Sequence, residues 1–390
     1  MKWRASWLVI PLLLAACSSK DALQEPSPLP DIKPLVKVDR LWSADTGAGN
    51  TGEGLGLVPA VTGTAVYAAD EAGVVVAQDR ERGKQLWRRA LDTPVSAGPA
   101  VAYNQVFVGT REGEVLALSA GDGTLQWRTQ LSGEVLAVPA VNGDAVAVRT
   151  TDGRIALIDR VSGMVRWTHD AGSAPLSLRA ASAPLLLADA VLTGTSTGML
   201  VALERTGGQV IWERRIAEPS GKSELDRLID IAGDFVLDES RVYVATYQGR
   251  LVALDMLSGQ FLWQQPLSTF RSLALAGDTV YAVDADSRIV SVRTADGVVL
   301  WRQEALLGRH ATGASVQGDW LLVGDYEGWL HVIRRSDGVL VGRSKVDGDG
   351  LVVPAVADDG LVFALGRSGR LVALRLEPGA DAVAAGAATP

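Results

Sequence analysis

The sequence is organised by one short motif, Gly-x-x-x-Trp, which returns about every 40 residues. A seventh copy, Gly338 to Gly342, has lost its Trp, and a turn residue, usually Gly, stands ten positions before the first Gly of each copy. Repeats of this length, punctuated by turns, are typical of β-propellers. The six intact copies are Gly83/Trp87, Gly123/Trp127, Gly163/Trp167, Gly208/Trp212, Gly259/Trp263 and Gly297/Trp301.

The segments between the turns predict strands that are buried on both faces. Residues 115–118 read Val-Leu-Ala-Leu and residues 155–158 read Ile-Ala-Leu-Ile, so apolar residues run consecutively instead of alternating. Radially stacked blades bury strands in this way, whereas a β-sandwich leaves one face wet. The sequence therefore predicts an all-β fold, an eight-bladed β-propeller made of four-stranded antiparallel blades.

The two ends of the repeat array predict how the ring closes. The last repeat supplies only three strands, around residues 352–356, 361–365 and 371–376. Residues 38–44, which contain Trp42, form a strand that has no partners of its own. Pairing this N-terminal strand with the last three completes an eighth blade and removes two exposed sheet edges.

The N-terminus has the features of an export signal. Lys2 and Arg4 precede a short apolar run that ends Leu-Ala-Ala-Cys at Cys17. The run is too short to span a bilayer and is typical of a secretory signal. Its end resembles the lipobox of bacterial lipoproteins, which implies lipidation of Cys17. The alternative is an ordinary signal peptide with a chance Cys.

The rest of the chain divides around this N-terminus. We expect a lipoprotein signal peptide over residues 1–16, a lipid-anchored flexible tether over 17–37, the propeller over 38–376 and a disordered tail over 377–390. Cys17 is followed by Ser18 and Ser19. In the Gram-negative lipoproteins that this N-terminus resembles, an Asp at this place signals retention in the inner membrane, and this chain has none there. The expected location is therefore the periplasmic side of the outer membrane, reached through the lipid anchor alone.

Composition excludes several classes of function. The net charge of −8 argues against a nucleic-acid binder. A single Cys excludes an intramolecular disulfide, an iron–sulfur cluster and a thiolate zinc site, and three His leave little for a metal centre. We expect neither a cofactor nor a metal. Because the Trp residues recur once per repeat, we interpret them as packing residues between blades and not as ligand-stacking residues.

Length variation points to a candidate partner-binding surface. The spacings inside the repeats are constant, so the extra residues fall in the connections between blades, and two long ones, 170–182 and 217–231, enter consecutive blades. We expect them to adjoin on one face, with an apolar anchor and a charged rim. The alternative is a pair of solvated loops whose leucines pack back onto the propeller. The predicted anchor is Leu176, Leu178 and Arg179, and the predicted rim is Asp226, Arg227 and Asp230.

The repeats and these loops together resemble known families. The Gly-x-x-x-Trp repeats over residues 38–376 resemble the PQQ-type β-propeller repeat. Within that class, the lipobox, Leu-Ser-Leu-Arg at 176–179 and Glu-Leu-Asp-Arg-Leu-Ile-Asp at 224–230 resemble the lipoprotein B family of the outer-membrane β-barrel assembly machinery. This resemblance implies a non-catalytic scaffold that binds the periplasmic POTRA domains of the barrel-inserting subunit. Other lipoproteins of the same complex and unfolded outer-membrane protein clients are further candidate partners.

The resemblance also assigns roles to individual residues. The partner-contacting positions of that family match Leu176, Leu178, Arg179 and Asp230 in this chain. A second acidic contact, two residues after Asp230, is replaced here by Ala232. At this position the second connection departs from the family's pattern.

Two rival functions belong to other classes. Quinone-dependent (PQQ) dehydrogenases resemble this propeller and add a calcium–quinone site, usually capped by a vicinal disulfide, which Cys17 alone cannot form. Their site needs acidic and amide side chains near the axis, whereas residues 58–61, 98–102 and 138–141 are apolar or small. The third interpretation is a propeller that binds a small ligand or peptidoglycan.

Overall fold

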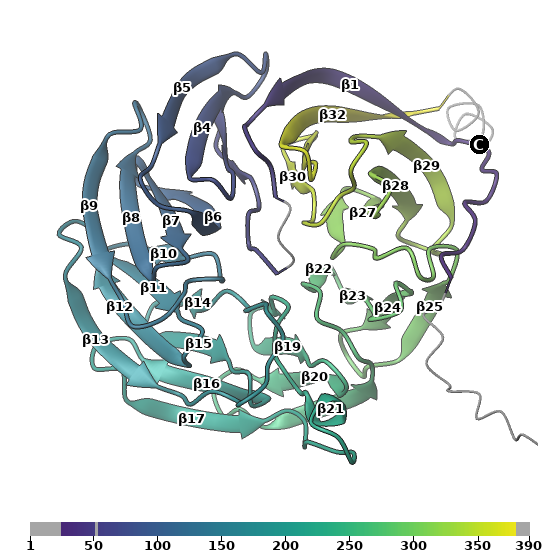
Figure 1. The fold of residues 1–390 in the computed structure, drawn as a ribbon. Coiled ribbons are helices and arrows are strands. Elements are labelled where there is room, and N and C mark those ends of the chain that lie inside the picture. Colours follow the sequence, from purple (N-terminus) through teal and green to yellow (C-terminus); the bar gives the residue numbers. More distant parts are fainter. Residues whose placement is uncertain (1–24, 51–53, 380–390) are drawn as a thin grey trace, which may run out of the picture.

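The fold is a ring of eight four-stranded antiparallel sheets, seen along its axis in Figure 1. The computed structural model describes residues 25–50 and 54–379. The prediction of an all-β, eight-bladed propeller is confirmed. The signal peptide, Cys17 and most of the expected C-terminal tail lie outside the described residues.

Each blade is named here by its place in the ring, and its strands are given from the axis outwards. In seven blades this is also the order of the strands along the chain. Blade 1 contains β2 (Ala60–Val61), β3 (Ala65–Ala69), β4 (Val74–Asp79) and β5 (Gln85–Ala90); blade 2, β6 (Val95–Ala102), β7 (Gln105–Thr110), β8 (Glu114–Ser119) and β9 (Leu125–Gln130); blade 3, β10 (Ala140–Asn142), β11 (Ala145–Arg149), β12 (Arg154–Asp159) and β13 (Val165–Asp170); blade 4, β14 (Leu185–Leu186), β15 (Ala190–Gly194), β16 (Met199–Glu204) and β17 (Val210–Arg215).

The second half of the ring repeats this arrangement, with a single 3-10 helix, η1 (Leu225–Arg227), among the described residues. Blade 5 contains β18 (Val236–Leu237), β19 (Arg241–Ala245), β20 (Arg250–Asp255) and β21 (Phe261–Pro266); blade 6, β22 (Ala274–Ala276), β23 (Thr279–Val283), β24 (Ile289–Arg293) and β25 (Val299–Gln303); blade 7, β26 (Ser315–Gln317), β27 (Trp320–Gly324), β28 (Trp329–Arg334) and β29 (Leu340–Lys345); blade 8, β30 (Val356–Asp358), β31 (Leu361–Leu365), β32 (Arg370–Pro378) and β1 (Val36–Asp45).

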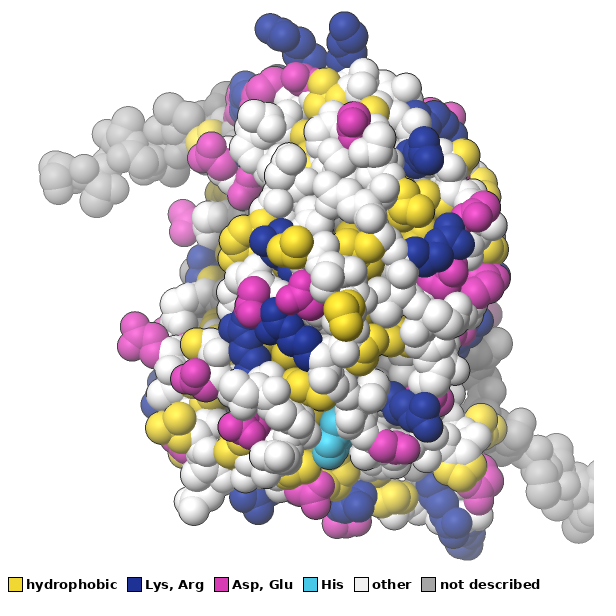
Figure 2. Space-filling view, turned by 90° about the vertical axis from the view of Figure 1, so that its left-hand side faces the viewer, with side chains coloured by type: hydrophobic (Ala, Val, Ile, Leu, Met, Phe, Trp, Pro, Cys, Tyr) yellow, Lys and Arg dark blue, Asp and Glu magenta, His cyan; other side chains and the backbone are white. Residues whose placement is uncertain are grey.

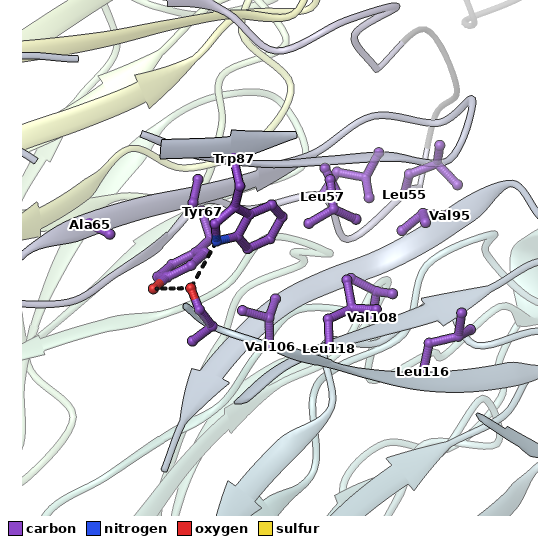
Figure 3. Close-up of a cluster of buried hydrophobic side chains, with 14 of the residues drawn as sticks. Leu55, Leu57, Ala65, Tyr67, Trp87, Val95, Val106, Val108, Leu116 and Leu118 are labelled. Atoms are coloured by element: carbon purple, nitrogen blue, oxygen red, sulfur yellow. Dashed lines mark hydrogen bonds between the residues drawn. The ribbon is translucent and has the colours of Figure 1, made fainter. Parts of the chain in front are cut away.

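The core lies between neighbouring blades. The second and third strands of a blade are buried on both faces, as the consecutive apolar residues predict: every residue of β7 is buried, and so are the four central residues of β8. The outer strand β9 buries only Trp127. Figure 3 shows one interface, in which Tyr67 and Trp87 of blade 1, with Leu57 from the connection that enters this blade, face Val106 and neighbouring residues of blade 2.

The Gly-x-x-x-Trp motif joins each blade to the next. Trp127 in blade 2 donates its indole N–H to the carbonyl of Arg160 in blade 3, at 2.8 Å, and its ring lies against Gly163 of the following motif. Gly163 has a φ of +74°, and a Cβ there would lie 2.8 Å from the Trp127 ring. Because the turn needs positive φ and the ring needs the space, only Gly fits. The same pairing is formed by Trp42, Trp87, Trp167, Trp212, Trp263 and Trp301.

The ring is closed by the N-terminal strand, as predicted. β1 pairs antiparallel with β32, from Val36 opposite Pro378 to Asp45 opposite Arg370, with a bulge between Arg40 and Trp42. Both strands extend two residues beyond the limits predicted from the sequence, 38 and 376. The first and last parts of the array therefore share one blade (Figure 1).

The segment before β1 differs from the flexible tether expected over residues 17–37. The Ser27 amide donates to the Leu307 carbonyl at 2.9 Å, and the Leu35 amide donates to the Val341 carbonyl at 2.8 Å. In Figure 1 this purple segment follows β29 towards β25. It was missed because it contains no periodic pattern. We call residues 25–35 the strap.

The meander fixes which loops share a face. The connection face carries the connections between blades and the turns between second and third strands. The opposite face carries the remaining turns, including those between third and fourth strands that contain the motif glycines. The two long connections singled out from the sequence both lie on the connection face.

A candidate docking surface on the connection face

The first connection, between β13 and β14, presents the predicted anchor at the surface. The Leu176 side chain is 43% exposed, and Leu178 is half-buried. Arg179 is exposed, and its guanidinium lies 2.6 Å from the carboxylate of Glu134, which belongs to the connection entering blade 3. Apolar and basic groups thus stand together at this point, and the leucines are not packed back fully onto the propeller.

The second connection, between β17 and β18, contains the 3-10 helix η1. Leu225 is 66% exposed, and Asp226 and Arg227 are also exposed. The contacts of η1 are local: Asp226 accepts a hydrogen bond from the Ser223 amide at 3.0 Å, and Gln248 of blade 5 donates to the Leu225 carbonyl at 3.0 Å. The structure thus ties η1 to blade 5 through Leu225, and it brings a different part of this connection to the anchor segment, residues 176–179.

That part contains Asp230, whose predicted place at the charged rim is wrong. The residue is buried, with 1% of its surface exposed. Its carboxylate accepts a hydrogen bond from the Leu178 amide at 2.7 Å and lies 4.0 Å from the guanidinium of buried Arg149. Asp230 therefore holds the anchor segment in position from below. Ala232, the position of the second acid expected by resemblance, is also buried.

The two connections adjoin, as predicted, and carboxylates of the second hold the first. Besides the Asp230 contact, Asp234 accepts a hydrogen bond from the Ala183 amide at 2.6 Å and another from the Ser272 hydroxyl at 3.1 Å. Charge-assisted hydrogen bonds from backbone amides are among the stronger ones in proteins. The anchor segment is thus fixed by side chains that follow it by about 50 residues in the chain.

Burial governs the electrostatics beneath the anchor. It raises the pKa of Asp230 to about 6, against the opposing effects of the Arg149 charge and the Leu178 hydrogen bond. Desolvation likewise raises the pKa of Asp234, opposed by its hydrogen bonds from Ala183 and Ser272. One oxygen of Asp230 is buried without a hydrogen-bond partner. Charge on this carboxylate is therefore costly for the folded state.

A hollow of about 160 Å³ opens beside the anchor. Glu134, Arg149 and Ser196 line it together with Leu136 and Leu178, so polar and apolar side chains share its wall. Sequence reasoning missed Glu134 and Arg149. The available signal was Arg149 itself, a charged residue that ends the otherwise apolar strand β11, Ala-Val-Ala-Val-Arg.

The surface elsewhere offers less specific chemistry. On the side formed by β5, β9 and β13, acidic and basic side chains are interspersed with hydrophobic ones (Figure 2). Over residues 25–50 and 54–379, no three His, Cys, Asp or Glu side chains form a group that could hold a metal ion. Within the same ranges, no helix has the length and apolar character needed to cross a membrane.

Comparison with known proteins identifies relatives that match almost the whole chain. The family model described as outer membrane protein assembly factor BamB matches residues 37–108, 71–303 and 285–382. A protein of that name from Marinobacter adhaerens is 50% identical over 366 residues, 94% of each chain. Another, from Pseudomonas aeruginosa, is 42% identical over 375 residues, which is 96% of this chain and 99% of that protein.

A solved structure agrees with the sequence relatives. The crystal structure of BamB from Moraxella catarrhalis superimposes with a TM-score of 0.80 at 25% sequence identity, covering 87% of this chain and all of the other. Fold, sequence and repeat pattern thus lead to the same group of proteins. The chain belongs to the family of the outer membrane protein assembly factor BamB.

Proposed function

We propose that this protein is a non-catalytic scaffold in outer-membrane protein assembly, and that it binds the POTRA domains of the barrel-inserting subunit. It acts on the periplasmic side of the outer membrane, where a lipid on Cys17 anchors it. Family membership supports the assembly role, since relatives of up to 50% identity carry that name among those compared. The lipobox at Cys17 supports attachment through a lipid.

The anchor segment is the centre of the proposed interface. Leu176 offers an exposed apolar contact, and the guanidinium of Arg179 offers planar donors for a partner carboxylate or carbonyl. The hollow beside Leu178 has room for one partner side chain. Interfaces concentrate their binding energy in such a group, an apolar residue and an Arg surrounded by polar atoms. Leu225, Asp226 and Arg227 extend the surface towards blade 5.

The observation that carries the proposal is how the anchor segment is held. Exposed leucines on a mobile loop would lose conformational entropy on binding, which reduces affinity. Here the Leu178 amide is bonded to buried Asp230, and the Ala183 amide to Asp234. The segment is therefore pre-organised for a partner, and Asp230 contributes as a positioning residue and not as a contact.

A binding experiment with purified components tests this proposal. The mature chain and its Arg179→Glu variant are titrated onto the immobilised POTRA domains of the barrel-inserting subunit. We expect the variant to bind about 30-fold more weakly or worse, since a central interface residue contributes about 2 kcal/mol or more. Circular dichroism and the melting temperature check that the variant is folded.

Lys84→Glu is the matched control. Lys84 is exposed in the turn between β4 and β5, on the opposite face, and its substitution makes the same change of charge. We expect its affinity to equal that of the unmodified chain. The face assignment is wrong if Lys84→Glu releases the POTRA domains while Arg179→Glu retains them.

A further inference from the structure

The strap crosses the side of blade 7 from one face of the ring to the other. Leu35, at its C-terminal end, bonds to Val341, the second residue of β29, immediately after a turn on the opposite face. Ser27, near its N-terminal end, bonds to the carbonyl of Leu307, which follows β25 on the connection face. The chain therefore enters on the connection face and reaches the start of β1 on the opposite face.

Buried charges hold the connection-face end of the strap. Arg309 is 3% exposed and donates a hydrogen bond from its guanidinium to the Ser27 carbonyl at 3.0 Å. The same guanidinium donates to Asp325 at 2.9 Å and to Glu327 at 2.6 Å. Buried His331 lies 3.1 Å from the Asp325 carboxylate. Because two carboxylates fix Arg309, its remaining N–H groups form a rigid site for the strap.

The middle of the strap is held by packing. Leu29 packs against the hydrophobic cluster between blades 6 and 7, as Trp301 and Leu340 also do. Arg343 of β29 donates to the Pro30 carbonyl at 3.1 Å. The prolines around Leu29 limit the conformational freedom that docking removes.

The far end of the strap explains the missing Trp of the seventh motif. Val36 is 2% exposed, and a Cβ on Gly342 would lie 2.9 Å from the Val36 carbonyl oxygen. Gly379, at the position of the next motif glycine, bonds to the Leu35 carbonyl at 2.8 Å. Leu35 and Val36 thus occupy the place that a Trp fills at the other junctions.

We propose that the strap orients the propeller on its membrane, with the connection face and its docking surface towards the bilayer. Without the strap, the chain would leave the ring at Val36, on the opposite face. With the strap docked, it leaves at the connection face, near the junction of blades 6 and 7. This orientation rests on the lipid anchor of the proposed function.

Covalent geometry makes this constraint a tight one. Ten peptide units separate Cys17 from Ser27, where the strap is bonded to the ring, so they span at most about 36 Å when fully extended. A chain free from Cys17 to Val36 contains nineteen units and could extend to about 68 Å. Docking therefore brings one edge of the connection face close to the lipid headgroups.

Energy transfer to labelled lipids tests the orientation. Ala285→Cys and Ala295→Cys are a matched pair, because both alanines are exposed in turns of blade 6, at opposite ends of β24. Cys17 is the only Cys of the chain and is consumed by the lipid, so each added thiol is unique. Each lipidated variant carries a donor dye and is bound to phosphatidylethanolamine/phosphatidylglycerol vesicles that contain an acceptor-labelled headgroup.

We expect transfer from position 285 to exceed transfer from position 295 at least twofold. Replacing residues 27–31, Ser-Pro-Leu-Pro-Asp, by Gly-Ser-Gly-Ser-Gly keeps the length of the chain but releases the strap. This replacement should abolish the difference or reverse it. Equal transfer from the two positions in the intact chain overturns the proposal, and so does a difference that survives the replacement.

A second measurement tests the docking of the strap independently of the lipid on Cys17. Hydrogen exchange of the Ser27 and Leu35 amides is followed in the Cys17→Ser chain, in which no lipid is attached. Slow exchange at both amides supports a docked strap, and exchange at the rate of an unstructured peptide overturns it. If the strap amides exchange slowly but the unmodified chain does not bind vesicles, lipidation of Cys17 is contradicted, and the proposed orientation is contradicted with it.

Discussion

A glycine in one blade and a tryptophan in the blade before it form the packing unit that recurs around the ring. The indole N–H satisfies a turn carbonyl of the next blade, and the ring fills the space left by the absent Cβ. The pairing is invisible within a single repeat, because the Gly and the Trp of one motif contact different neighbours. Both residue types are nevertheless evident from sequence, so the junctions were predictable.

Gly163→Ala tests this unit. The substitution places a methyl group 2.8 Å from the Trp127 ring at a φ of +74°. Gly172→Ala is the control, since Gly172 has the same φ and open space around it. Both changes cost about 1–2 kcal/mol for the left-handed backbone. Gly163→Ala should cost about 1–3 kcal/mol more through overpacking, measured by urea unfolding. Equal losses of unfolding free energy in the two variants would mean that the Trp127 indole moves aside without cost.

The role of Asp230 could be predicted only in part. Its sequence position marked it as important, but its burial depends on Arg149 of another blade, and no local pattern reports that contact. Short-range sequence reasoning therefore placed a buried positioning residue at the rim. Leu176 and Arg179, which lie on the surface, were placed correctly because their exposure follows from the length of the connection.

Asp230 predicts a specific pH dependence. Its folded-state pKa of about 6 exceeds the ordinary value of 3.8, so between these values the folded chain retains a proton that the unfolded chain has lost. Stability from this group is therefore highest at low pH and falls as the pH rises towards 6. The unfolding free energy should drop by about 1–3 kcal/mol more in the unmodified chain than in Asp230→Asn between pH 4 and 7. Parallel curves would contradict the burial of charge on Asp230.

At the scale of elements, a segment of the strap and β1 replaces a Trp side chain at the junction of blades 7 and 8. Seven junctions use a Trp from an outer strand, and the junction of blades 7 and 8 uses the backbone and side chains of Leu35 and Val36. The loss of Trp at Gly342 was visible in the sequence. The compensating segment was not, because Pro-rich chain without periodicity carries no signal for the surface that it will cover.

Restoring the motif should therefore be harmful. In Gly342→Trp the new Cβ would lie 2.9 Å from the Val36 carbonyl oxygen, so the side chain cannot enter while residues 35 and 36 are docked. We expect a lower melting temperature and faster hydrogen exchange at Leu35. A melting temperature above that of the unmodified chain would show that a Trp replaces the segment without cost.

The closing strand is expected to dominate the stability of its blade. Deleting residues 36–45 removes β1 and exposes the edge of β32. Deleting residues 18–24 removes only chain that precedes the described segment. We expect a large fall in melting temperature for the first deletion and almost none for the second. Equal values for the two deletions would exclude β1 as a structural strand.

At the scale of the whole molecule, the ring provides one rigid body with two distinct faces. The fold was predictable because the same pattern recurs in every repeat. An error in one strand would not have changed the predicted number of blades. The docking surface depends on two non-repeating connections, and its arrangement needed contacts between blades 3, 4 and 5. The proposed function thus resides where the repeat is broken.

Membrane attachment is the prediction that belongs to this scale. Cys17→Ser should release the protein from the membrane fraction. The purified variant should keep its affinity for the POTRA domains, because Cys17 and the docking surface are separate parts of the chain. Fractionation after a high-salt wash and the binding titration measure the two effects. Retention of the variant in the membrane would argue against lipidation.

Closure by β1 also sets an order of events in folding. Val36 pairs with Pro378, almost the whole length of the chain away, so the strand made first finds its partner only when the last strands arrive. Until then β1 stays an unpaired strand, a state that favours aggregation. Contacts of such high sequence separation also slow folding. In a chain exported as proposed, we therefore expect the N-terminal strand to stay exposed longest.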